Sequence, residues 1–86
     1  MVMESDATLI TGCSTGIGRA TAIRLAEAGR PVYATARNVS AIADLADYGC
    51  ELLTLDVTEE ASMVAAVDVV VDRHGAVGAL VNNAGY

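Results

Sequence analysis

The chain has 86 residues, a formal net charge of −6 and 53% hydrophobic residues, a composition that allows one domain at most. Acidic side chains are spread along the sequence, and this charge disfavours a surface that binds nucleic acid or acidic lipids. No apolar stretch approaches the ~20 residues that cross a bilayer. Residues 1–6 carry no positive charge of the kind that begins a signal peptide, so we expect a cytoplasmic protein without a membrane span.

The first apolar run, residues 7–10, leads directly into a glycine-rich turn with Gly12, Gly16 and Gly18. Such a turn between a strand and a helix presents backbone amides and a helix N-terminus to a phosphate. Gly12 permits a tight exit from the strand, Gly16 lets the backbone approach a pyrophosphate, and Gly18 lets the helix pack closely. The spacing departs from the usual G-x-G-x-x-G fingerprint, so the turn alone also fits a connection without a ligand.

Strand and helix patterns alternate along the chain. The helical spacing of residues 17–28, ended by Gly29, precedes a second strand at residues 31–36. Ser40 is the expected N-cap of a short helix that ends at Gly49, and residues 51–55 form the third strand.

Thr58 is the expected N-cap of a longer helix, which Gly75 ends before a fourth strand at residues 79–82. The side chains expected on the buried side of this helix recur at steps of three and four residues; they are Met63, Val67, Val70, Val71 and His74.

This alternation predicts an α/β fold, a Rossmann-type doubly wound parallel sheet with four strands and three helices. Right-handed crossovers give the strand order 3-2-1-4. Residues 1–86 would form the N-terminal, incomplete portion of such a dinucleotide-binding domain.

Arg37 follows the second strand, where a protein that binds a free ribose 2′-hydroxyl usually has an acidic residue. The preceding residue, Ala36, is neutral, and a guanidinium can grip a 2′-phosphate with two hydrogen bonds. The sequence therefore favours NADP(H), while NAD(H) stays open. The alternative interpretation is a solvated loop arginine.

Polar residues also follow the third and fourth strands. Asp56 could accept a hydrogen bond from an adenine amino group, or it could help Thr58 to cap the next helix. Asn82 and Asn83 could bond within the sheet or contact a ribose. We expect His74, the sole histidine, to be structural.

The two cysteines, Cys13 and Cys50, lack metal-ligand spacing and are expected to be reduced thiols, so no metal site is predicted. Cys13 lies inside the glycine-rich turn, where a small space-filling residue is the favoured interpretation.

Four motifs in this order and spacing resemble the short-chain dehydrogenases/reductases. They are Thr11-Gly12-x-x-x-Gly16-Ile17-Gly18, the strand that ends in Ala36-Arg37, Leu55-Asp56-Val57 and Asn82-Asn83-Ala84-Gly85. The segment Val32-Tyr33-Ala34-Thr35-Ala36-Arg37 looks most like the branch of 17β-hydroxysteroid and retinol dehydrogenases, many of which prefer NADP(H). The resemblance covers the chain from about Ala7.

The resemblance implies an NADP(H) site along the carboxyl ends of the strands. Arg37 would take the 2′-phosphate, and Asp56 and Val57 would flank the adenine. The residues implied at the pyrophosphate and its adjoining ribose are Gly12, Ser14, Thr15, Gly16, Ile17 and Gly18. Those implied at the adenine-side ribose and the floor of the cleft are Asn83, Ala84 and Gly85.

The family transfers a hydride between nicotinamide and an alcohol or carbonyl substrate, with a tyrosine and a lysine four residues later as the catalytic pair. This sequence contains no lysine, so no catalytic residue is assigned and the chain is expected to be inactive alone. The alternative is a stand-alone dinucleotide-binding or regulatory module that pairs through the edge of its fourth strand. A homo-oligomer stays open for a full-length parent enzyme.

Overall fold

The computed structural model describes residues 5–14 and 16–83 of the chain. Every predicted strand and helix is present, and their ends lie within two residues of those expected. In chain order the elements are β1 (Thr8–Ile10), α1 (Gly16–Glu27), β2 (Val32–Ala36), the 3₁₀ helix η1 (Val39–Tyr48), β3 (Glu51–Thr54), α2 (Glu60–His74) and β4 (Ala79–Val81).

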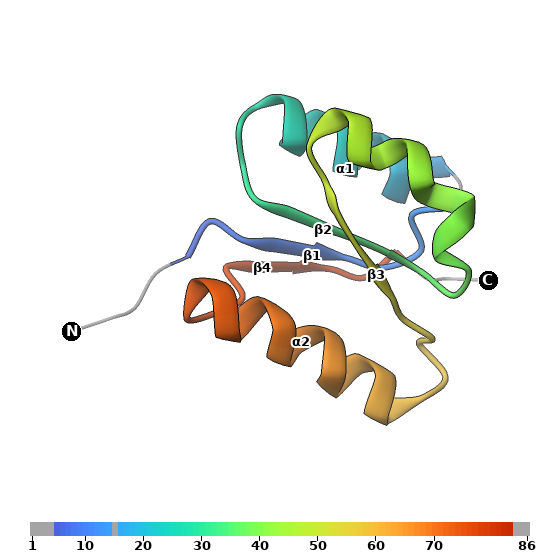
Figure 1. Cartoon of the computed structure of the whole chain (residues 1–86), viewed down its shortest axis with the longest axis vertical. Coiled ribbons are helices and arrows are strands. Elements are labelled where there is room, and N and C mark those ends of the chain that lie inside the picture. Colours follow the sequence, from blue (N-terminus) through green and yellow to red (C-terminus); the bar gives the residue numbers. More distant parts are fainter. Residues whose placement is uncertain (1–4, 15, 84–86) are drawn as a thin grey trace.

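The four strands form one parallel sheet in the predicted order β3-β2-β1-β4. Helices cover both faces, with α1 and η1 on one side and α2 on the other (Figure 1). Strands β1 and β2 are buried along their whole length, because a central parallel strand is covered from both sides.

Two apolar cores lie on the two faces of the sheet. The core beneath α1 and η1 includes Ile10, Ala22, Ala34, Ile42 and Leu45. The core beneath α2 is built around Leu9, Tyr33, Leu55, Ala66 and Val70. Each strand therefore sends alternate side chains to opposite layers, as a pleated strand must.

The predicted helix caps Ser40 and Thr58 are both wrong. Asn38 caps η1, and its Oδ1 accepts hydrogen bonds from the amide and the hydroxyl of Ser40 at 3.2 and 2.6 Å. The Oδ1 of Asp56 likewise accepts from the amide and the hydroxyl of Thr58 at 2.9 and 2.6 Å. In both turns the Asn or Asp side chain bonds two residues onward, so the later hydroxyl becomes a donor instead of a cap.

The predicted buried side of α2 is correct except at Val71. Ala66 and Val70 are buried and Met63 and Val67 pack against the core, whereas Val71 is 41% exposed. The contact of α2 with the sheet is narrower than the sequence pattern suggests. Gly75 ends the helix in the left-handed conformation, with φ of 83°, as expected.

His74 packs at the end of α2 against Tyr33 of β2. The hydroxyl of Tyr33 and Nε2 of His74 are 2.8 Å apart, and the two rings meet edge to face. This supports the structural role expected for His74, because the contact fixes the last turn of α2 to the sheet.

Candidate functional site

The parallel sheet brings the carboxyl ends of its four strands to one edge. Strand β1 leads there into the glycine-rich turn, β2 into Arg37, β3 toward Asp56, and β4 into Asn82 and Asn83. All of the motifs singled out in the sequence therefore meet at this edge. Three of the implied contact residues, Thr15, Ala84 and Gly85, lie outside the residues that the structure describes.

The glycine-rich turn has an open backbone at the start of α1. Gly12 and Gly16 adopt positive φ angles of 65° and 58°, which side chains rarely tolerate. Apart from its chain neighbours and the backbone of its own helix, no atom of the described residues lies within 4 Å of the point where a Cβ on Gly16 would stand. Ser14 is exposed, and Ile17 is 75% exposed although it is a large apolar residue. The turn thus leaves space beside a helix N-terminus, as a phosphate group requires.

Gly18 is required by close approach. A Cβ on Gly18 would stand 2.6 Å from the carbonyl oxygen of Gly12 and 2.5 Å from Nδ2 of Asn83. The expected close packing of Gly18 is confirmed, and its nearest neighbours are the turn itself and the residue after β4.

The two asparagines after β4 hold the turn through Thr11. The Thr11 hydroxyl donates to Oδ1 of Asn82 at 3.1 Å and accepts from the amide of Asn83 at 2.9 Å. Nδ2 of Asn83 donates to the carbonyl oxygen of Gly12 at 3.3 Å. The asparagines therefore bond to the neighbouring strand and turn, which supports the first of the two interpretations left open.

Two buried threonines in this network were not predicted. Besides Thr11, Thr35 of β2 donates from its hydroxyl to the carbonyl oxygen of Ile10 at 2.8 Å, and its own carbonyl accepts from the amide of Cys13 at 2.9 Å. Both threonines are fully buried. A threonine at the end of a buried strand is the available signal, because its hydroxyl must find a partner there.

Arg37 and Asp56 lie at the ends of neighbouring strands. The pKa of Asp56 is lowered mainly by the hydrogen bonds from the hydroxyl and amide of Thr58, with a smaller contribution from the positive charge of Arg37. The carboxylate is thus held within the turn before α2, whatever further contact it makes. Val57 packs against the core beneath α2, and Arg37 is exposed.

Cys13 and Cys50 are buried thiols that form no disulfide with each other. Burial raises the pKa of both, and for Cys50 the nearby Cys13 adds to the rise. Neither resembles an activated nucleophile, whose pKa would be lowered. Within residues 5–14 and 16–83, no group of three His, Cys, Asp or Glu side chains could hold a metal ion. None of the described helices is long and apolar enough to cross a bilayer.

The arrangement suits a negatively charged ligand that spans the edge of the sheet. A helix N-terminus with space beside Gly16 stands after β1, and an exposed guanidinium stands after β2. His74 and Tyr33 meet at the last turn of α2, away from this edge. The geometry therefore indicates binding of a phosphate-containing molecule.

A doubly wound parallel sheet with a glycine-rich turn after its first strand defines a Rossmann-like fold. The sequence model described as short chain dehydrogenase matches residues 6–86, and the chain belongs to this family.

Curated relatives match almost the whole chain. The short-chain dehydrogenase/reductase GME11361 of Pestalotiopsis microspora is 44% identical over 82 residues, which cover 87% of this chain and 31% of the relative. The 3-oxoacyl-[acyl-carrier-protein] reductase FabG of Vibrio harveyi is 41% identical over 88 residues, 99% of this chain and 36% of the relative. The chain thus spans about a third of the length of these relatives.

Solved structures agree with this assignment. A metagenomic short-chain oxidoreductase in complex with NADP superposes with a TM-score of 0.87 at 30% identity, over 98% of this chain and 41% of the other. The F189W actinorhodin polyketide ketoreductase with NADPH gives 0.82 at 36% identity, over 95% and 34%. The expected family is therefore shown, whereas none of these comparisons distinguishes the branch of 17β-hydroxysteroid and retinol dehydrogenases.

Proposed function

We propose that this chain is the NADP(H)-binding part of a short-chain dehydrogenase/reductase that transfers a hydride between nicotinamide and an alcohol or carbonyl substrate. The observation that carries the proposal is the open glycine-rich turn at the start of α1, with Arg37 at the same edge of the sheet. The two similar structures that contain NADP and NADPH support the choice of cofactor.

Each part of the edge has a proposed task. The amides of the turn bind the pyrophosphate, and Arg37 holds the 2′-phosphate. Asp56 and Val57 border the adenine, and Asn83 positions the turn. The nicotinamide, when bound, supplies or accepts the hydride. The proposed contact residues are Gly12, Ser14, Thr15, Gly16, Ile17, Gly18, Arg37, Asp56, Val57, Asn83, Ala84 and Gly85.

Catalysis needs groups that these residues do not supply. The sequence contains no lysine, so it lacks the catalytic tyrosine–lysine pair of the short-chain dehydrogenases/reductases. We propose that residues 1–86 are an incomplete domain that binds the cofactor in the cytoplasm without turning over a substrate. A substrate pocket and a homo-oligomeric interface would belong to a full-length enzyme, and residues 32–37 favour the 17β-hydroxysteroid and retinol dehydrogenase branch.

The test is Arg37→Asp, with the dissociation constants of NADPH and NADH measured by calorimetry. Loss of a charge-assisted contact worth about 1.5–3 kcal/mol should weaken NADPH binding by about tenfold or more and spare NADH. Arg30→Asp is the matched control, because Arg30 is exposed at the other end of β2. An equal loss for both cofactors would show that Arg37 acts through folding, and absence of NADPH binding by the unmodified chain would contradict the proposal.

A stand-alone binding module is the second candidate, and the exposed β4 favours it. The intact mass of the protein from its native source separates the two candidates. A mass near 8.8 kDa supports the module. A mass several-fold larger supports the oxidoreductase.

A further inference from the structure

We propose that a pocket at the amino ends of β2 and β3, closed by the last turn of α2, binds a small zwitterionic amino acid. Arg73 takes the carboxylate of this ligand, and Glu51 takes its ammonium group. The pocket lies at the opposite end of the strands from the glycine-rich turn and Arg37. The proposal therefore goes beyond the cofactor site, and it does not depend on which dinucleotide binds there.

The pocket is small and is built by three elements. Its volume of about 310 Å³ lies near the lower end of the range of about 300–1,000 Å³ for small-molecule sites. This size suits one small molecule and not a dinucleotide. The lining residues include Pro31 just before β2, Tyr33 of β2, Glu51 of β3, and Arg73 and His74 of α2.

The strand register brings the polar side chains of the pocket to one face of the sheet. Tyr33 and Glu51 are partners in the pairing of β2 with β3, so both side chains project to the face that α2 covers. The hydroxyl of Tyr33 and Nε2 of His74 are 2.8 Å apart and satisfy each other. This contact fixes the inner wall of the pocket, and the charged side chains of Glu51 and Arg73 are left to receive a ligand.

Arg73 and Glu51 are opposite charges that hold each other loosely. Their closest nitrogen and oxygen are 3.6 Å apart, beyond the roughly 3.2 Å of a good hydrogen bond, and both side chains are more than half exposed. An exposed ion pair of this kind contributes little to stability, so the pair can be exchanged for contacts with a ligand. The guanidinium carbon of Arg73 lies 5.9 Å from the ring centroid of Tyr33, a cation–π distance that keeps the guanidinium at the pocket.

The two charges select the class of ligand. A simple anion would be repelled by the carboxylate of Glu51, and a simple cation would be repelled by the guanidinium of Arg73. An amino acid carries both charges, and a guanidinium binds a carboxylate with two parallel hydrogen bonds. Pro31 adds an apolar wall beside these groups, so the ligand that fits has a short aliphatic side chain.

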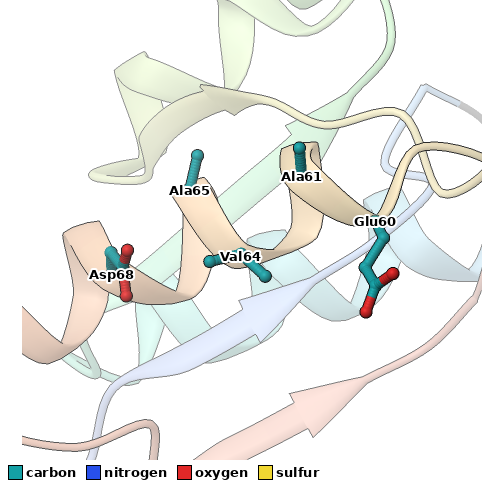
Figure 2. A pocket seen from close by; sticks show the side chains of 5 residues that line it. All are labelled: Glu60, Ala61, Val64, Ala65 and Asp68. Atoms are coloured by element: carbon teal, nitrogen blue, oxygen red, sulfur yellow. The ribbon is translucent and has the colours of Figure 1, made fainter.

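A groove on the outer flank of α2 provides a comparison, because its charges differ. Figure 2 shows its lining side chains along the helix; they are Glu60, Ala61, Val64, Ala65 and Asp68. Both charged residues of this groove are acidic, so its lining offers no cation to a carboxylate. The juxtaposition of opposite charges therefore distinguishes the pocket at Arg73, and Glu60 supplies a matched control for Glu51.

The experiment titrates the 86-residue chain with L-valine and follows the backbone amide chemical shifts by NMR. The amides of Glu51 and Arg73 should shift and saturate with a dissociation constant on the order of 1 mM, whereas those of Gly12 and Gly16 should stay unchanged. Two matched probes separate the charges of the ligand. Isovalerate lacks the ammonium group and isobutylamine lacks the carboxylate, so each should bind at least about tenfold more weakly than valine.

Charge-removing variants test the two assigned contacts. Arg73→Gln and Glu51→Gln should each weaken valine binding by about tenfold or more, whereas Arg24→Gln on α1 and Glu60→Gln should leave it unchanged. The proposal is overturned if valine does not shift the pocket amides, if a probe with one charge binds as tightly, or if the control variants weaken binding as much.

The same spectra separate this proposal from the proposed function. Shifts caused by valine at the glycine-rich turn in place of the pocket would overturn the proposal. Absence of shifts at the turn on adding NADPH, with valine binding intact, would contradict only the proposed function.

Discussion

Gly18 shows how tightly the candidate site is built. A methyl group attached to its α-carbon would clash with the carbonyl of Gly12 and the carboxamide of Asn83. The helix, the turn and Asn83 beyond β4 thus approach one another closely at Gly18. A side chain at this point acts on three elements together.

Gly18→Ala should destabilise the fold by about 1–3 kcal/mol, the usual range for overpacking, because the backbone of Gly12 cannot move without disturbing the turn. Urea unfolding followed by circular dichroism measures this loss. Ala20→Ser, at an exposed position of the same helix, should change the free energy of unfolding by less than about 0.5 kcal/mol. Equal effects of the two variants would contradict the close approach.

Asp56 makes a pH-dependent contribution at the same edge. Its pKa is lowered by the hydrogen bonds from Thr58, so its stabilising effect is present above its ordinary value, about 3.9, and is lost as the pH falls through the lower folded value. Asp56→Asn should therefore lower the melting temperature at neutral pH and leave it unchanged in strong acid.

Melting curves of the Asp56→Asn variant from neutral pH into the acid range provide the measurement. Thr58→Val removes the hydroxyl donor and should reduce the same pH-dependent difference. A difference in melting temperature between Asp56→Asn and the unmodified protein that does not change with pH would contradict the lowered pKa of Asp56.

At the scale of elements, single contacts tie each helix to its neighbours. Arg19 of α1 forms an exposed two-point ion pair with Asp44 of η1 and thereby lowers the pKa of Asp44. On the other face, Tyr33 of β2 bonds to His74 at the end of α2. These contacts join elements that are far apart in sequence.

Tyr33→Phe should cost about 0.5–1.5 kcal/mol, because the partly buried Nε2 of His74 loses its partner while the ring stays packed. Tyr48→Phe is the matched control, since Tyr48 is exposed. Equilibrium unfolding in urea measures both variants. A smaller loss for Tyr33→Phe than for Tyr48→Phe would rule out a stabilising role of the hydrogen bond.

The elements were predictable because apolar runs and glycines mark their ends, and parallel crossovers then determine the strand order. The caps Ser40 and Thr58 were not predictable by the same rules. Asn38 and Asp56 stand two residues earlier, and their side chains take the hydroxyls as donors. In both turns two neighbouring polar side chains could accept hydrogen bonds, and the earlier side chain is the one that does.

At the scale of the molecule, the sheet is unevenly covered. Leu9 and Leu80 are paired in register on one face, yet one is fully buried and the other is 53% exposed. A leucine at the centre of the sheet therefore contributes more to the free energy of unfolding than a leucine on its edge strand.

Leu9→Ala should cost about 2–5 kcal/mol, against a total stability of about 4–13 kcal/mol for a chain of this length. Leu80→Ala should cost less than about 1 kcal/mol in the isolated chain, because it leaves no enclosed cavity. Urea unfolding of the two variants compares them directly. Similar losses would mean that β4 is covered in solution.

The edge where the motifs meet was predictable from topology, since parallel strands bring their carboxyl ends together. The hydroxyls of Thr11 and Thr35 were missed, because their partners come from other strands and the sequence does not reveal the register. The exposure of Val71 was missed for a similar reason, since it depends on how α2 lies across the sheet. Contacts within the proposed cofactor site stay predictions.

The reactivity of the two buried thiols can be used to measure local opening of the fold. Sγ of Cys13 bonds to the carbonyl of Ile10, and Sγ of Cys50 bonds to the carbonyl of Ala22 in α1. Both thiols lie in the core beneath α1 and η1, so we expect a thiol reagent to react with them when this layer separates from the sheet. The labelling rate therefore measures the free energy of that local opening, and a ligand seated on the turn should slow it in proportion to its occupancy.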